Sequence, residues 1–274
     1  MVELEDRDVL TDLSVLETEP AEEYHARAGE YLSSHLLADF RKCPQLYRQK
    51  LDGLVEEKDK ASFLEGRATH ALVLEGRERF DAEYVRIPVN SKTGKPIDGR
   101  TKAFKTWATA ESRTVLPHDM ASRIERIAAA VRSHDEAQKL LSAGRAAGVL
   151  RTEYCGQPCQ IRIDWLNPAL GIVDLKTCND VAWFAADGRT YGYAHQLAFY
   201  RAVLAQALGQ KRGPVHVIGI EKKAPYRVTV GPLDEEALAL AQRENEASMR
   251  RLKDCQERQV WPTDYEEKRV FRFI

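Results

Sequence analysis

Two aspartates and a lysine meet on one face of a predicted β-hairpin. The hairpin pairs residues 160–166 with residues 171–177 around a turn centred on Ala169. Side chains alternate between the two faces of a strand, so this register places Asp164 opposite Asp174. The lysine, two residues after the second aspartate, lies on the same face opposite an arginine. The pattern therefore predicts a small group of charges on neighbouring strands.

The other face of the hairpin is apolar and is expected to meet the core. A shift of one residue would turn this apolar set outward, so the register is well specified. The predicted inward residues are Ile161, Ile163, Trp165, Val173, Leu175 and Thr177, and the polar face adds Arg162 opposite Lys176.

Directly opposed carboxylates destabilise a sheet unless one is protonated or a cation binds between them. Mg²⁺ is a hard cation that takes such oxygen ligands. Lys176 lies where its ammonium could assist a bound water. The hairpin therefore predicts a metal site beside Asp164 and Asp174, and the alternative is an ordinary solvated polar face.

This charged hairpin resembles the core of the PD-(D/E)xK nucleases, and three further segments match one branch of them. Gly66-Arg-Ala-Thr-His70 resembles the branch's G-x-x-x-H helix, and Gln196 with Tyr200 resembles its Q-x-x-x-Y helix. Residues 37–47 resemble its F-x-x-C-P-x-x-Y segment. The motifs fall in the expected order over residues 31–200. The chain is similar to the RecE-type exonucleases (exonuclease VIII), which phages and prophages encode.

The resemblance implies a role for each matching residue. His70, Asp164, Asp174 and the Leu175 carbonyl are expected to bind Mg²⁺, for which Mn²⁺ substitutes. Lys176 is expected to orient or deprotonate water, and Gln196 and Tyr200 to position the scissile region. The residues expected to be catalytic are thus Asp164, Asp174, Lys176, Gln196 and Tyr200.

The resemblance also implies a biological role. It predicts 5′→3′ digestion of linear double-stranded DNA, which leaves 3′ single-stranded tails for recombination by strand annealing. A ring-shaped homo-oligomer, a RecT-like single-strand annealing partner and the cytoplasm of a bacterial host follow from it as well.

Other readings of the same residues stay open. The chain could be a related RecB-type or endonucleolytic nuclease, or a catalytically silent DNA-binding relative. An iron–sulfur cluster needs four thiolates, and Cys43 has only Cys255 near the C-terminus to join it. Cys155, Cys159 and Cys178 lack the paired second half of a zinc site, so neither a cluster nor a structural zinc is expected.

The elements that must position these residues follow from periodicity and turn signals. Together they predict an α/β (α+β) fold with a restriction-endonuclease-like core, in which a mixed central sheet is flanked by helices in three layers. The expected strands are 83–88, 149–155, 160–166, 171–177, 215–221 and 226–230. The expected helices are 34–51, broken near Cys43-Pro44, then 62–74, opened by a Ser62–Glu65 capping box, and 120–141, 191–208 and 235–259.

Composition fits one large domain. The 274 residues are 43% hydrophobic and 30% charged, and no run of 18 apolar residues predicts a membrane span. Five cysteines without a secretion signal favour a reduced, intracellular protein. We expect a single nuclease domain over 29–274, preceded by an acidic tail or loosely docked segment at 1–28.

Charge is unevenly distributed. Residues 1–23 carry nine acids and one base, a charge of −8, so the remaining chain carries +7 of the total −1. Residues 90–105 read as a basic loop, which is expected to contact DNA phosphates without reading sequence. Its alternative is a solvated loop. The bases concerned are Lys92, Lys95, Arg100, Lys102 and Lys105.

Overall fold

The computed structural model describes residues 12–55, 61–210 and 213–272. Its centre is a mixed six-stranded sheet in the order β1-β4-β5-β6-β7-β8. Only β6 and β7 are parallel in this sheet, and the other neighbours are antiparallel. The strands are β1 (Glu17–Thr18), β4 (Arg145–Tyr154), β5 (Gln157–Asn167), β6 (Gly171–Cys178), β7 (Val215–Glu221) and β8 (Val228–Pro232).

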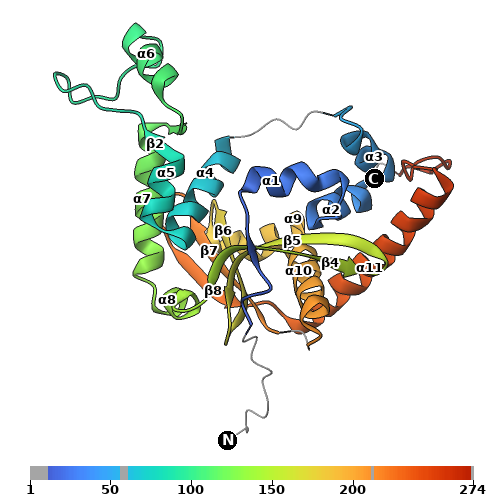
Figure 1. Ribbon diagram of the computed structural model, residues 1–274. Helices are drawn as coiled ribbons and strands as arrows, with labels where there is room; N and C mark the ends of the chain where they lie inside the picture. Colours follow the sequence, from blue (N-terminus) through green and yellow to red (C-terminus); the bar gives the residue numbers. More distant parts are fainter. Residues whose placement is uncertain (1–11, 56–60, 211–212, 273–274) are drawn as a thin grey trace, which may run out of the picture.

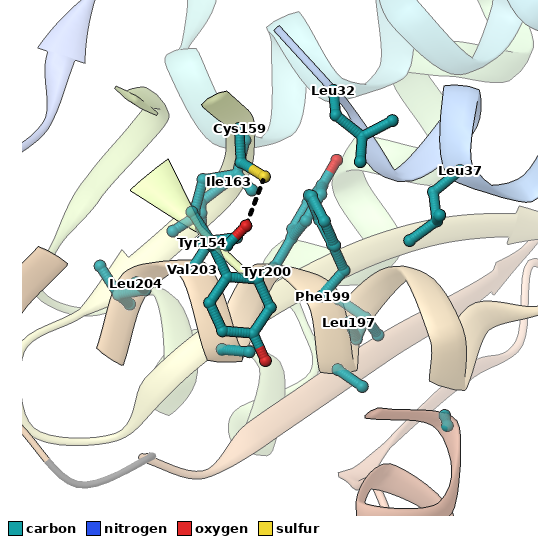
Figure 2. Close-up of a cluster of buried hydrophobic side chains, with 14 of the residues drawn as sticks. Leu32, Leu37, Tyr154, Cys159, Ile163, Leu197, Phe199, Tyr200, Val203 and Leu204 are labelled. Carbon is teal, nitrogen blue, oxygen red and sulfur yellow. Dashed lines mark hydrogen bonds between the residues drawn. The ribbon is translucent and has the colours of Figure 1, made fainter. Parts of the chain in front are cut away.

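Helices cover both faces of the sheet, which confirms the predicted three-layer fold (Figure 1). One face packs against α10 (Tyr193–Leu208), which in turn contacts α11 (Glu235–Arg258) and α2 (Ser34–Lys42), with α3 (Pro44–Leu51) beyond. Figure 2 shows Leu197, Phe199 and Val203 of this buried cluster.

The opposite face packs against helices that lie between β1 and β4 in the chain. The π-helical turn η2 (Ala71–Glu75), α7 (His118–Arg132) and α8 (Asp135–Leu141) bury Leu74, Ile127 and Val131 there. The remaining elements are α1 (Ala21–Ala26), η1 (Arg27–Gly29), α4 (Ala61–His70), α5 (Arg77–Glu83), β2 (Tyr84–Arg86), α6 (Lys102–Ala110), β3 (Thr114–Leu116), η3 (Val181–Trp183) and α9 (Phe184–Tyr191).

Strand β6 is buried on both faces, as expected of a strand with a parallel neighbour and two helical layers. Ile172 joins the cluster beneath α10, whereas Val173 and Leu175 join the cluster beneath α7. The predicted single apolar face of the hairpin is therefore divided. Ile161 and Ile163 belong to the first cluster, and Trp165, Val173 and Leu175 belong to the second.

One predicted long helix is two helices. The segment 120–141 breaks after α7, where His134 Nδ1 accepts a hydrogen bond from the Ala137 amide and caps α8. Local apolar spacing did not reveal this break, because apolar residues continue across it. The helix predicted over 191–208 is confirmed as α10, and it starts at Tyr193 because Gly192, with a left-handed φ of 71° and ψ of 36°, separates it from α9.

Two further local predictions are wrong. Ser62 lies inside α4 rather than at its start, and Glu65 pairs with Arg123 at 2.9 Å instead of closing a capping box. The basic loop is helical in its last part, because Thr101 accepts a hydrogen bond from the Phe104 amide and begins α6 at Lys102.

The expected loosely docked segment is built into the fold from residue 12 onward. Strand β1 pairs with the edge of β4, and Leu16 is only 2% exposed. Glu19 forms an ion pair with Arg151 at 2.7 Å. Apolar burial and this ion pair explain the docking, and residues 1–11 lie outside the described part of the chain.

Among the helices of the described ranges, none combines the length and the apolar composition that a membrane span requires.

Candidate active site

The two strands of the hairpin part at Asp164. Their ladder has the expected register at Trp165–Val173, Leu166–Ile172 and Asn167–Gly171, and it ends there. Beyond it, Asp164 Oδ2 accepts a hydrogen bond from the Leu175 amide at 3.0 Å, so a side chain replaces the missing strand contact. The expected ladder pairing of Asp164 with Asp174, and of Arg162 with Lys176, therefore does not form.

A distortion in β4 accompanies this opening. Ala147 lies between the β4 partners of Ile163 and Trp165, and its φ of 49° is left-handed. This conformation is uncommon for a residue other than glycine and marks a local strain. Asp164 and Ala147 both line the cavity at this point.

Asp174 is a buried carboxylate with few polar partners. Its side chain is 1% exposed, and among the described residues Oδ1 has no hydrogen-bond donor. Lys176 Nζ lies 2.6 Å from Asp174 Oδ2 as an ion pair. Burial and the neighbouring Asp164 raise the pKa of Asp174 to about 6, against the opposing effect of Lys176.

His70 completes this charge cluster from α4. Its Nδ1 lies 3.5 Å from Asp164 Oδ1. Burial opposes protonation of His70, but the Asp164 carboxylate raises its pKa above the usual value. Burial likewise opposes ionisation of Asp164, but His70, Lys176 and the Leu175 amide hold the pKa of Asp164 well below its usual range.

The α10 helix brings Gln196 and Tyr200 to the same place. They are four residues apart on one helix face, and Gln196 Nε2 donates to Tyr200 Oη at 3.2 Å. Tyr200 is 5% exposed, and burial raises its pKa. The pair is therefore held rigidly beside Lys176 and the two aspartates.

These predicted residues surround one cavity of about 1140 Å³. Residues from α1, α4, β5, β6 and α10 line it, so the cavity brings together elements that are far apart in the sequence. The predicted residues that line it are His70, Asp164, Leu175, Lys176, Gln196 and Tyr200, and Asp174 lies directly behind Lys176.

The predicted DNA-binding residues do not line this cavity. Lys92, Lys95 and Arg100 lie on an exposed arm, and Lys102 and Lys105 lie on α6 at its end (Figure 1). Arg100 is paired with Asp98 at 3.0 Å.

A divalent cation fits the chemistry of this cluster. The buried Asp174 carboxylate, a neighbouring carboxylate and an imidazole are a mixed oxygen and nitrogen donor set suited to Mg²⁺ or Mn²⁺. Over the described ranges, no three His, Cys, Asp or Glu side chains already converge as a metal site. The present contacts of Asp174 with Lys176 and of His70 with Asp164 would therefore rearrange on binding.

The cysteines behind the alternative metal sites have other surroundings. The Cys43 thiol accepts a hydrogen bond from the Leu46 amide at 3.4 Å and caps α3. Cys159 and Cys178 are buried, and Cys155 is exposed in the turn between β4 and β5.

Sequence reasoning assigned no role to Arg162 or Tyr193, and both line the cavity. Within the described residues, Arg162 has no carboxylate at ion-pair distance, although it lies two residues from Asp164 on β5. Residues two apart on a strand point to the same face, and this alternation could have placed Arg162 beside Asp164. Tyr193 lies beneath Lys176, with Nζ 5.3 Å from the ring centroid, and no motif pointed to it.

Known proteins resemble this chain in family and in fold. A family model described as "PDDEXK-like domain of unknown function (DUF3799)" matches residues 33–272. A crystal structure from Eubacterium rectale named "Putative exonuclease" is similar at a TM-score of 0.67 and 20% identity, over 93% of this chain and 95% of that one. At this identity the likeness shows the fold alone. No curated protein matches the chain.

Proposed function

Because the chain belongs to the PDDEXK-like family whose model matches residues 33–272, we propose that it is a metal-dependent DNA exonuclease. The expected membership among PD-(D/E)xK nucleases is confirmed, and the RecE-type assignment stays a prediction. The observation that carries the proposal is the buried cluster in which the Asp174–Lys176 ion pair lies beside Asp164 and His70, with Asp174 Oδ1 left without a donor among the described residues.

The cluster suits hydrolysis of a phosphodiester. Asp164, Asp174, His70 and the Leu175 carbonyl would hold the ion. A bound Mg²⁺ would act as a Lewis acid toward the scissile phosphate and acidify water. Side chains around the cavity would stabilise the developing charge and position the substrate.

Lys176 supplies a positive charge where the phosphate becomes more negative. Asp174 and Asp164 raise the pKa of Lys176 against the effect of burial, so the ammonium is charged at neutral pH. It therefore stabilises charge and orients water by hydrogen bonding, and a role as general base requires that a metal first separate it from Asp174.

Gln196, Tyr200 and Arg162 position the substrate. The Gln196–Tyr200 hydrogen bond fixes two polar groups on the cavity wall. Arg162, which has no ion pair among the described residues, is free to bind a phosphate of the same strand. The site thus combines charge stabilisation with contacts that read the backbone and not the base sequence.

From the resemblance alone, the proposal extends to 5′→3′ digestion of linear duplex DNA that leaves 3′ single-stranded tails. A ring-shaped oligomer and a single-strand annealing partner belong to the same proposal.

The test uses purified full-length protein with linear duplex labelled at either 5′ or 3′ ends, and with closed circular duplex. We expect Mg²⁺-dependent loss of linear DNA, no cutting of circles, and release of 5′ label first. Chelation of the metal should abolish the activity, and Asp174→Asn and Lys176→Gln should each lower kcat by 10³-fold or more, on the order of 4 kcal/mol.

Glu153→Gln is the matched control, because Glu153 is an exposed acid on β4 that is absent from the cavity lining. Equal cutting of circles would identify an endonuclease. Unchanged activity of Asp174→Asn would refute the assigned site.

A further inference from the structure

Two tyrosines connect Lys176 to the mouth of the cavity. The Tyr193 ring lies beneath Lys176, and the Tyr191 ring stacks on Tyr193 with centroids 6.1 Å apart and planes inclined by 29°. Both tyrosines line the cavity. Tyr193 is half-buried, whereas Tyr191 is 70% exposed. Aromatic surface therefore runs without a break from the reacting centre to solvent.

The local fold fixes this arrangement. Tyr191 ends α9 and Tyr193 begins α10, and the left-handed Gly192 turns the chain between them. Phe184 supports the Tyr193 ring, with centroids 6.0 Å apart. The exposed ring of Tyr191 is thus carried by two helix ends and not by a long loop, so it can serve as a preformed surface.

The surroundings of Tyr191 indicate which ligand would cover it. The same cavity contains Lys176, Lys222 and Arg162, and Arg162 has no ion pair in the described part of the chain. A ligand that combines a flat apolar face with negative charges satisfies both features. A nucleotide within a DNA strand has this chemistry, because its base stacks on an aromatic ring while its phosphate meets a cation.

We infer that Tyr191 is a stacking platform for a base of the strand that is cleaved. The inference rests on the proposed nuclease function. We take the stacked base to lie within the strand, where it must part from a neighbouring base to stack on Tyr191, so the strand beside the reacting phosphate enters the cavity single-stranded. A duplex substrate must therefore be frayed at its end before it is cut, at a cost of a few kcal/mol per opened step.

Stacking can be measured without catalysis. Single-stranded oligonucleotides, each with one 2-aminopurine at a different position, are titrated with metal-free protein in the presence of a chelator. At one position, wild-type protein should change the fluorescence in the way that stacking does. Tyr191→Phe should keep this signal, and Tyr191→Ala should lose it and bind about 5- to 150-fold more weakly, the fold-change for 1–3 kcal/mol per stacked base.

Tyr265→Ala is the matched control, because Tyr265 is 71% exposed and lies outside the cavity lining. It should leave fluorescence and affinity unchanged. In turnover with Mg²⁺, Tyr191→Ala should raise KM more on blunt duplex than on DNA with an unpaired end, because stacking helps to hold the opened strand.

The outcomes separate this inference from the proposed function. If Asp174→Asn abolishes cleavage but Tyr191→Ala changes neither fluorescence nor KM, the stacking platform is refuted and the nuclease assignment stands. If Tyr191→Phe is as defective as Tyr191→Ala, the hydroxyl acts and stacking is refuted. If Asp174→Asn stays active while the 2-aminopurine signal depends on Tyr191, the assigned catalytic site fails and the stacking platform is supported.

Discussion

Glu221 and Asp174 are both buried carboxylates, and they differ in the donors that they meet. Glu221 is fully buried and accepts hydrogen bonds from the Val181 amide at 3.1 Å and from Arg227 Nε at 3.0 Å. Asp174 has the Lys176 ammonium 2.6 Å from Oδ2, whereas its Oδ1 has no donor among the described residues. Because a buried oxygen without a donor is costly, the unmatched Oδ1 is explained by function and not by stability.

The contacts of Glu221 predict a pH-dependent contribution to stability. Arg227 and the Val181 amide lower the pKa of Glu221 from 4.5 to about 2. A lowered folded-state pKa adds stability above the unfolded value, and this stability is lost as the pH falls through 4.5 toward 2. Glu221→Gln should therefore cost about 1–2 kcal/mol at pH 7, since Arg227 is half exposed and partly screened.

The measurement is urea unfolding of both proteins from pH 7 to pH 3. The difference in free energy of unfolding should shrink below pH 4.5. A difference that stays constant with pH would show that the ionised carboxylate is not what stabilises the fold. Glu267→Gln, at an exposed acid outside the helices and strands, should show no difference at any pH.

At the scale of elements, the arm that ends in α6 is largely exposed to solvent. It projects from the helical layer beside α5 and α7, away from the sheet (Figure 1). No residue of α6 is buried, although Phe104 and Trp107 contact each other at 5.8 Å between centroids. Its basic residues therefore contribute little to the stability of the fold.

This exposure separates DNA affinity from stability in a simple variant. Replacing Lys92, Lys95 and Lys102 by Gln should weaken binding of duplex DNA at low salt. The slope of log K against log salt should fall by up to about 3, because each phosphate contact releases about 0.9 counterion. The thermal midpoint should stay within about 1 °C, since surface substitutions of this kind have small effects.

The control for the arm replaces Lys139, Lys253 and Lys268, which are exposed elsewhere on the chain. It should keep the wild-type salt slope. Equal loss of affinity in both triple variants would indicate that net charge alone matters and that the arm has no special role. Fluorescence anisotropy with a labelled duplex at several salt concentrations provides the measurement.

At the scale of the whole molecule, the segment before the first helix closes the sheet. Leu16 packs over Gly148, where an added Cβ would lie 2.5 Å from the leucine side chain. Arg145 donates to the Leu16 and Leu13 carbonyls, and Arg151 pairs with Glu19. The acidic segment thus covers an edge strand that would otherwise expose unpaired backbone groups.

Leu16→Ala tests how firmly this segment is bound. Removing a side chain that is 2% exposed should lower the free energy of unfolding by about 2–4 kcal/mol, through lost burial and the cavity that remains. Leu240→Ala, at a leucine that is 51% exposed on α11, should cost less than 1 kcal/mol. Urea denaturation measures both, and equal small losses would mean that the segment is only loosely attached.

The sequence alone determined the fold class, the boundaries of β7 and the residues that gather at the cavity. Alternation and turn signals give the hairpin register correctly near Ala169. A shift of the pairing by one residue would turn the buried apolar side chains toward solvent. Strand alternation singles out Asp164 and Lys176 as part of one charged face, whereas His70 and Tyr200 were named only by the resemblance to the PD-(D/E)xK nucleases.

Only the tertiary structure decided how those residues meet. The strands part at Asp164, and the apolar face divides between two helical layers, because long-range packing and not local pattern governs both. Gly192 separates Tyr191 from Tyr193, whose rings stack, and the Tyr193 ring lies beside Lys176 of β6. These contacts depend on how separate elements pack together, so they leave no periodic pattern in the sequence.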